Sequence, residues 1–445
     1  MRLTTPERVR TLQRKLYRKA KHEPAYRFYS LYDKVYRVDI LGHAYDLVRS
    51  NRGSAGIDGM TFEAIEAGEG VAAFLAELEE VLRERTYRPS PVKRVWIPKP
   101  DGTKRPLGIP TIRDRVAQMA LKLVIEPIFE ADFCDNSYGF RPGRSAHDAV
   151  DDVSDALRSG HTKVIDADLS EYFDTIPHAR LLAVVAERIS DGAVLRLIRM
   201  WLKAPVVEEG EDGKGRHTGG GKGNRKGTPQ GGVISPLLSN LYLHVLDRIW
   251  ERRQLERRLG ARLVRYADDC VLLCRRDAER PRAVLVQVLE RLGLSLNEGK
   301  TRMVDASVES FDFLGFELRM YKGRDTGMTY PRVQPSKKSL KKIKDRIARL
   351  THRRRTPVPL DRVVEEVNTV LRGWVNYFHY RNCSNSLSHL KWHVEERLRT
   401  HLRKRHKHHD RNTGYIRFAS RHLYERYGLY KVPTTAGWTR AHALR

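Results

Sequence analysis

The sequence predicts an α+β fold followed by a helical, strongly basic C-terminal part, and three observations support this. Short apolar segments with extended patterning recur between segments of helical periodicity. No internal repeat is apparent, which disfavours a solenoid. From residue 334 onward the chain has helical periodicity and holds 27 Lys and Arg against 8 Asp and Glu.

This last quarter of the chain carries most of the excess charge. The whole sequence has 83 Lys and Arg against 55 Asp and Glu, a net charge of +28, and +19 of it lies in residues 334–445. Such one-sided charge indicates a polyanionic partner, nucleic acid before a membrane surface, with a solubilising face as the alternative. No run approaches the roughly 18 apolar residues of a membrane span, and no apolar signal segment begins the chain.

The N-terminal region of residues 1–90 is predicted to be basic and helical. Apolar residues follow a helical period through 32–41, and a turn rich in glycine follows at 53–59. The spacing of Val71, Phe74, Leu75, Leu78 and Leu82 predicts one helix over residues 63–85.

The next segments alternate between strands and helices. Val92–Pro98 and Lys104–Pro110 flank a Pro-Asp-Gly turn and predict a hairpin, and a helix is expected over Ile112–Phe129. Thr162–Leu169 has the pattern of a short strand. Residues 209–227, rich in Gly, Lys and Arg, are interpreted as a mobile loop or a loose hairpin tip.

Cysteine usage argues against a zinc ribbon. The four cysteines form no CxxC pair, which favours a reducing compartment, and Cys270 and Cys274 are interpreted as buried strand residues.

Two adjacent acids interrupt an apolar segment at Leu263–Cys274. A hairpin there places Asp268 and Asp269 at its tip, where their mutual repulsion is relieved by solvent or a divalent cation. A solvated turn explains this string equally well.

A second acidic strand favours the cation. Period-two alternation puts Asp166 and Asp168 on one face of the segment Val164–Leu169. Two strands that bring acids into an apolar sheet suggest a site for Mg²⁺, which shares its coordination with substrate phosphates. A pair of such ions in a basic protein indicates phosphoryl transfer on nucleic acid.

At this point an ordered series of blocks resembles the bacterial group II intron reverse transcriptase/maturase family. Tyr266–Asp269 is similar to its catalytic box, and the other matching blocks, which keep the family's order, are Ser137–Ser145, Asp168–Asp174, Gly227–Asn240, Leu292–Thr301 and Phe311–Phe316. Leu371–Phe378 is similar to its maturase-domain motif. The blocks cover residues 40–320, and the set is far more specific than a lone pair of acids.

The resemblance implies a right-hand polymerase, with fingers and an antiparallel palm sheet at 91–325, a helical thumb or maturase domain at 334–400, and a basic segment at 401–445. It implies that two Mg²⁺ ions, with Mn²⁺ as a substitute, are held by Asp168, Asp268, Asp269 and the Leu169 carbonyl. The family pattern favours Asp168 over Asp166, because an aromatic gate follows five residues later.

The resemblance also implies nucleotide contacts. Lys99 and Arg105 would bind the incoming triphosphate, Phe173 would press against the sugar 2′ position, and Gln230 would hold the sugar. Phe173 also fits an ordinary core residue. Lys300 would protonate departing pyrophosphate, although an exposed lysine is more often a solvated surface residue.

The implied partners are group II intron RNA, an RNA template, a DNA primer or target DNA, and dNTPs, with no membrane. The expected location is the bacterial cytoplasm, at the nucleoid when target DNA is bound. Candidate RNA contacts are Arg141, Arg144, Lys337, Lys338, Lys341, Lys342, Arg372, Arg403, Lys404 and Arg405.

The resemblance leaves three functional readings open. The first is an RNA-directed DNA polymerase that also assists splicing and target-primed retrohoming. The second is an RNA-binding splicing cofactor with a dispensable polymerase, and the third is a host-recruited enzyme of defence or repair. With no cysteine after Cys383, we expect no DNA-cleaving domain.

Overall fold

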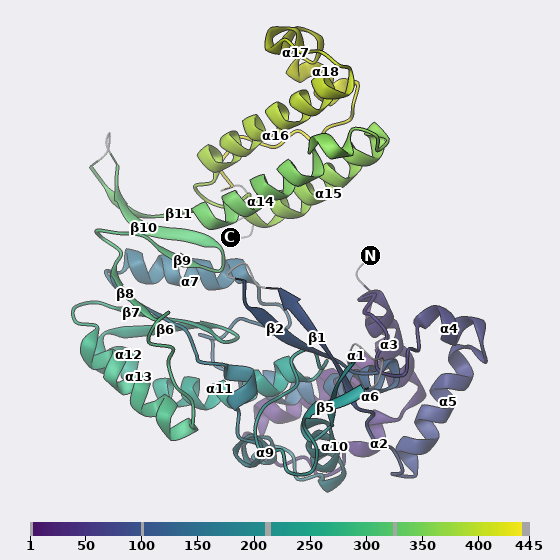
Figure 1. The fold of residues 1–445 in the computed structure, drawn as a ribbon. Coiled ribbons are helices and arrows are strands. Elements are labelled where there is room, and N and C mark those ends of the chain that lie inside the picture. The colour runs from purple at the N-terminus through teal and green to yellow at the C-terminus, as the bar shows by residue number, and fades with distance from the viewer. Residues whose placement is uncertain (1–2, 99–101, 210–214, 324–326, 438–445) are drawn as a thin grey trace. The chain divides into compact units, whose positions relative to one another are not determined.

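The computed structural model describes residues 3–98, 102–209, 215–323 and 327–437 (Figure 1). These residues belong to two compact units, and each unit joins segments that are distant in the chain. Unit 1 comprises residues 1–149, 167–272 and 279–301. Unit 2 comprises residues 150–166, 273–278 and 302–445.

The N-terminal part of unit 1 is helical, as predicted. Its helices are α1 (Glu7–His22), α2 (Tyr32–Val35), α3 (Val38–Ser50), α4 (Phe62–Ala67) and α5 (Gly70–Arg83).

The single helix predicted over residues 63–85 is wrong, because the chain breaks between α4 and α5. Gly68 has φ −84° and ψ −128°, outside the helical region, and Gly70 has φ +88°. Glycine adopts such angles at little cost, so two glycines outweigh the continuous apolar period.

The predicted hairpin of residues 92–110 is confirmed. β1 (Val92–Pro98) pairs antiparallel with β2 (Lys104–Ile109), from Lys93 opposite Ile109 to Pro98 opposite Lys104. β4 (Val206–Glu209) pairs parallel with β1 and antiparallel with β5 (Gly215–Gly219), giving the order β2-β1-β4-β5. The region expected to be a loop or hairpin tip therefore contains a paired strand.

A second sheet has the strand order β6-β7-β3-β8 and contains both acidic strands. Its members are β3 (Lys163–Ala167), β6 (Ala261–Tyr266), β7 (Asp269–Cys274) and β8 (Arg302–Asp305). Cys270 and Cys274 are buried in β7, as predicted. The boundary between the two units runs through β3 and β7 themselves.

Between β2 and β8, the described residues form eight helices. They are α6 (Ile112–Glu130), α7 (Ala146–Arg158), α8 (Tyr172–Thr175), α9 (His178–Ala186), α10 (Gly192–Leu202), α11 (Ser235–Arg252), α12 (Leu255–Leu259) and α13 (Glu279–Leu292). α6 and α11 are buried over most of their surface and form the centre of the unit 1 core. Both helices also bury polar side chains, among them Asp114 and Gln118 of α6 and Asn240 and Asp247 of α11.

Unit 2 contains a three-stranded antiparallel sheet in the order β11-β10-β9 and a helical bundle. The strands are β9 (Phe311–Phe313), β10 (Phe316–Lys322) and β11 (Thr329–Pro335). The helices are α14 (Lys337–Leu350), the short η1 (Arg353–Arg355), α15 (Leu360–Phe378), α16 (Ser384–Arg405), α17 (Arg411–Arg417) and α18 (Ser420–Glu425).

The bundle has its own core, and Figure 1 shows α14, α15 and α16 running alongside one another. α15 begins directly after Pro359. On α14, Ile343, Ile347 and Leu350 face this core. Four of its five lysines, Lys337, Lys338, Lys341 and Lys342, lie on the opposite, exposed face, and Lys344 is half-buried.

Candidate active site

The turn between β6 and β7 presents the two adjacent aspartates. Asp268 is half-buried, and Asp269, the first residue of β7, is exposed. The residue before them, Ala267, has φ +58°, a left-handed conformation that is unusual for a residue with a Cβ atom. The predicted hairpin tip is therefore present, and it is sharp.

Asp168 lies directly after β3 and is held by the loop that ends in Thr301. The backbone N–H of Asn297 donates to the Asp168 carbonyl (2.8 Å), and the Asp168 N–H donates to the Thr301 hydroxyl (3.4 Å). The Lys300 Nζ lies 3.9 Å from an Asp168 carboxylate oxygen. Because both side chains are largely exposed, this ion pair adds little stability and leaves Lys300 able to change partner.

The charges around Asp268 show that the predicted residues interact. Burial raises the pKa of the Asp268 carboxyl above its usual range, the charge of Asp168 raises that pKa further, and the Arg105 guanidinium lowers it. Three residues that are far apart in the sequence therefore share one electrostatic environment. Two carboxylates coupled in this way provide a site at which a divalent cation relieves their repulsion.

Arg105 and Gln230 are in direct contact. The Arg105 Nε donates to the Gln230 side-chain oxygen (2.8 Å), and the N–H of Gly108 donates to the Gln230 backbone carbonyl (2.6 Å). Gly231, at φ +107°, lies so close to β2 that an added Cβ would be 2.3 Å from the Gly108 oxygen. The loop after β5 is thus docked on β2, while Lys99 lies outside the described residues.

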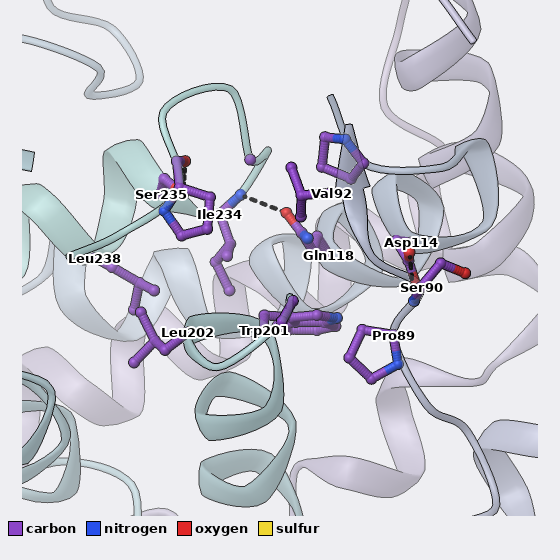
Figure 2. Close-up of a pocket in the computed structure, with 14 residues that line it drawn as sticks. Pro89, Ser90, Val92, Asp114, Gln118, Trp201, Leu202, Ile234, Ser235 and Leu238 are labelled. Carbon is purple, nitrogen blue, oxygen red and sulfur yellow. Dashed lines mark hydrogen bonds between the residues drawn. The ribbon is translucent and has the colours of Figure 1, made fainter. Parts of the chain in front are cut away.

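The loop that carries Gln230 rests on an apolar pocket (Figure 2). Figure 2 shows Trp201, Leu202 and Leu238 on one side and Gln118 of α6 reaching towards the loop. The buried Gln118 side chain accepts a hydrogen bond from the Ile234 N–H (3.4 Å). α6, α10 and α11 therefore support the loop from behind.

Phe173 lies in α8 and is buried. Its carbonyl accepts a hydrogen bond from the Thr228 N–H (2.7 Å), which joins the first acidic block to the Gln230 loop. Its ring packs edge-on against Tyr172, with centroids 5.5 Å apart. This geometry suits both roles expected for Phe173, a gate beside the nucleotide and a core residue.

Comparison with known families agrees with this arrangement. The family model described as "Reverse transcriptase (RNA-dependent DNA polymerase)" matches residues 97–318, and "Group II intron, maturase-specific domain" matches residues 340–417. The group II intron-encoded protein LtrA of Lactococcus lactis subsp. cremoris is 36% identical over 229 residues, 50% of this chain and 35% of that protein. Protein YkfC of Escherichia coli (strain K12) is 33% identical over 368 residues, 74% of this chain and 93% of that protein.

This chain belongs to the group II intron-encoded reverse transcriptase/maturase family. A further relative, the uncharacterized 91 kDa protein in the cob intron of Schizosaccharomyces pombe, is 26% identical over 414 residues, 76% of this chain and 49% of that protein. The chain spans nearly all of YkfC but half or less of the two intron-encoded relatives. It carries a reverse transcriptase domain followed by a maturase-specific domain, as the sequence motifs predicted.

Reverse transcriptase domains generally use divalent metal ions, and the acids of this member supply hard oxygen ligands. Within the described ranges, no three His, Cys, Asp or Glu side chains are grouped closely enough to hold a metal by themselves. The charges of Asp168 and Asp268 act on one another, so these two carboxylates form the centre of the candidate site.

The candidate RNA contacts differ in exposure. Lys337, Lys338, Lys341 and Lys342 of α14 (the four exposed α14 lysines), Arg372 and Lys404 are exposed. Arg405 is half-buried and donates to the carbonyls of Thr356 and Val358 (both 2.7 Å), and Arg403 is also half-buried. No helix of the described chain is long and apolar enough to cross a membrane.

The two arginines of the block before the first acid are engaged within the fold. The Arg141 guanidinium is buried, paired with Glu130 (2.7 Å), and bonded to the carbonyls of Cys134 and Ser137. An RNA contact by Arg141 does not fit this burial, and we drop it from the candidates. Arg144, which is partly exposed, is paired with Asp135 (2.5 Å).

Proposed function

We propose that this chain is an active RNA-directed DNA polymerase whose Asp168, Asp268 and Asp269 hold two Mg²⁺ ions, with Mn²⁺ as a substitute. The observation that carries the proposal is the strand order: β7, which follows the turn with Asp268 and Asp269, pairs with β3, which ends directly before Asp168. The charge of Asp168 also raises the pKa of Asp268. A purely structural role for these acids does not account for a half-buried carboxylate that burial and a second carboxylate both disfavour in its ionised form. The exposed Asp269 and the Leu169 carbonyl complete the proposed ligand set.

When bound, the metal ions activate the primer 3′-hydroxyl and stabilise the leaving oxygen. The protein's part is to place the reactants. Arg105, already anchored on Gln230, binds the triphosphate through its remaining N–H groups, and Lys99 adds a second positive charge. Gln230 contacts the sugar, and the Phe173 ring closes the 2′ side against ribonucleotides.

Lys300 completes the reaction by holding a proton at its Nζ for the departing pyrophosphate. Its loose pair with Asp168 keeps the ammonium beside the reacting phosphates without burying it. This role needs a lysine that moves between partners, which the 3.9 Å separation and the exposure of both side chains support.

Primer extension on an RNA template with Mg²⁺ tests the polymerase proposal. Wild-type protein should incorporate dNTPs, and the Asp268→Ala variant should not. Equal incorporation by the two proteins would show that the assignment is wrong.

We further propose that the chain binds its parent intron RNA, assists splicing and takes part in target-primed retrohoming. The exposed basic face of α14, a helix that overlaps the start of the maturase-specific match, supports RNA binding through phosphate and 2′-OH contacts. Splicing of the intron RNA at low Mg²⁺ tests this function separately. It should persist in Asp268→Ala and fail when the four exposed α14 lysines are neutralised.

A further inference from the structure

A buried polar network lies directly beneath the turn that carries Asp268. Arg265 of β6 has no exposed surface. Its Nη2 lies 2.5 Å from a carboxylate oxygen of Asp247 on α11, whose side chain is also fully buried. The Arg265 Nε donates to Asp247 as well (3.1 Å), so the two groups form a fork. Asn136 donates to the same aspartate (3.1 Å).

The remaining side of the Arg265 guanidinium reaches the turn. Its Nη1 donates to the backbone carbonyl of Ala267 (2.8 Å) and to the side-chain oxygen of Asn240 on α11 (3.1 Å). The Ala267 carbonyl belongs to the peptide that joins Ala267 to Asp268. The bond therefore fixes the peptide that immediately precedes the aspartate, at a residue whose positive φ costs of order 1–3 kcal/mol.

A neighbouring segment of unit 1 closes on the turn from another direction. Asn240 donates through its amide nitrogen to the carbonyl of Gly139 (2.6 Å), and a Cβ on Gly139 would lie 2.3 Å from the Ala267 nitrogen. The N–H of Tyr138 donates to the Arg265 carbonyl (2.9 Å). Any shift of Arg265 would thus disturb its hydrogen bond to the Ala267 carbonyl and the close packing of Gly139 against Ala267.

A buried ion pair is not needed to stabilise a core. Removing the two ions from water costs several kcal/mol per ion, which their attraction must offset, and apolar residues of similar volume often stabilise a fold equally well. What the network does provide is a fixed orientation of the turn, because a planar guanidinium with five donors can bond Asp247, Asn240 and the Ala267 carbonyl in one geometry.

We propose that Arg265 is a positioning residue for the polymerase reaction: it holds the strained Ala267–Asp268 peptide and thereby aims the Asp268 carboxylate. The inference rests on the polymerase function proposed above. A merely structural Arg265 would affect folding stability alone, whereas a positioning Arg265 also affects the order of the turn and its affinity for divalent ions.

Arg265→Lys is the informative substitution. Lysine keeps the charge opposite Asp247 but lacks the fork, so it loses the bond to Ala267 without leaving a buried acid unpaired. The matched control is Arg188→Lys. Arg188 is also buried, pairs with Asp132 (2.9 Å) and donates to the carbonyls of Ala20 (2.8 Å) and Tyr26 (3.1 Å). None of these partners belongs to the turn that carries Asp268.

Three measurements on the full chain separate the roles. Hydrogen exchange of peptides covering residues 263–272 should quicken in Arg265→Lys and stay at the wild-type rate in Arg188→Lys. Mn²⁺ binding followed by electron paramagnetic resonance should weaken about tenfold in Arg265→Lys alone. In primer extension, kcat should fall about 100-fold with little change in the dNTP KM, as a small misplacement of a reacting group predicts.

Equal exchange and equal Mn²⁺ affinity in the two variants, at matched Tm, would overturn the inference. If wild-type protein makes no DNA, the polymerase proposal fails. Hydrogen exchange and Mn²⁺ binding still decide in that case whether Arg265 orders the turn.

Discussion

The aspartate turn of unit 1 and helix α14 of unit 2 both depend on charge, but their surroundings differ. Asp268 is half-buried and lies beside a chain of specific hydrogen bonds that Arg265 and Asn240 donate to the carbonyls of Ala267 and Gly139. The four exposed α14 lysines lie on one helical face, with apolar residues opposite. Catalysis at one atom needs side chains held in fixed positions, whereas attraction to a phosphate backbone needs only a high density of positive charge. The two regions should therefore respond differently to the same kind of substitution.

Neutralising Asp268 is expected to have the largest effect and to separate the two regions most clearly. Asp268→Asn should reduce primer extension by about a thousandfold or more, because a charged metal ligand is lost. The folded state disfavours the ionised carboxylate, as the raised pKa shows, so Tm should equal or exceed that of the wild type. Calorimetry measures the Tm, and steady-state kinetics measure the loss of primer extension. A large drop in Tm would mean that Asp268 is structural.

Neutralising the exposed face of α14 should give the opposite result. Changing Lys337, Lys338, Lys341 and Lys342 to Gln should weaken intron RNA binding about tenfold to a hundredfold and reduce the log–log salt slope by at most about 3. Polymerase activity on a short primer–template should stay near the wild-type level.

The control for that experiment removes the same number of charges elsewhere. Arg252, Arg253, Arg257 and Arg258 are exposed arginines of unit 1 that are not among the candidate RNA contacts. Filter-binding titrations over a range of salt compare the two quadruple variants. Similar losses in both would show that RNA affinity is spread over the surface and does not belong to α14.

Sequence patterns predicted elements whose signals are local. The β6–β7 hairpin followed from an apolar segment interrupted by two acids, and the β1–β2 hairpin followed from the Pro-Asp-Gly turn between its strands. The helix over 63–85 was wrong because two glycines override an apolar period that is otherwise continuous. Local backbone chemistry outweighed periodicity there.

Contacts between distant segments were beyond sequence reasoning. Arg105 meets Gln230 across 125 residues, and nothing in either block alone requires that bond. Arg141 looked like a surface cation because its partner Glu130 lies on α6, in a different element. Arg265 gave the one usable signal: a charged residue within an apolar strand must find a buried partner.

An intermediate effect is expected at Arg105, which is exposed and hydrogen-bonded to Gln230. Arg105→Gln should raise the dNTP KM about tenfold and leave kcat nearly unchanged, because it removes a charged contact made in both ground and transition states. Lys104→Gln is the control, since strand alternation turns its exposed side chain to the opposite face. A kcat effect in Arg105→Gln larger than its KM effect would assign Arg105 to the reacting phosphate.

The smallest expected effects contrast two neighbours at the end of α16. Lys404 is exposed, whereas Arg405 joins the helix to the carbonyls of Thr356 and Val358 before α15. Lys404→Gln should therefore weaken RNA binding about twofold to threefold with Tm unchanged. Arg405→Gln should instead lower stability by about 1–2 kcal/mol, because two carbonyls lose a charged donor. If Arg405→Gln lowers RNA affinity more than Lys404→Gln at unchanged Tm, Arg405 belongs with the RNA contacts, and hydrogen bonds within the fold do not exclude that role.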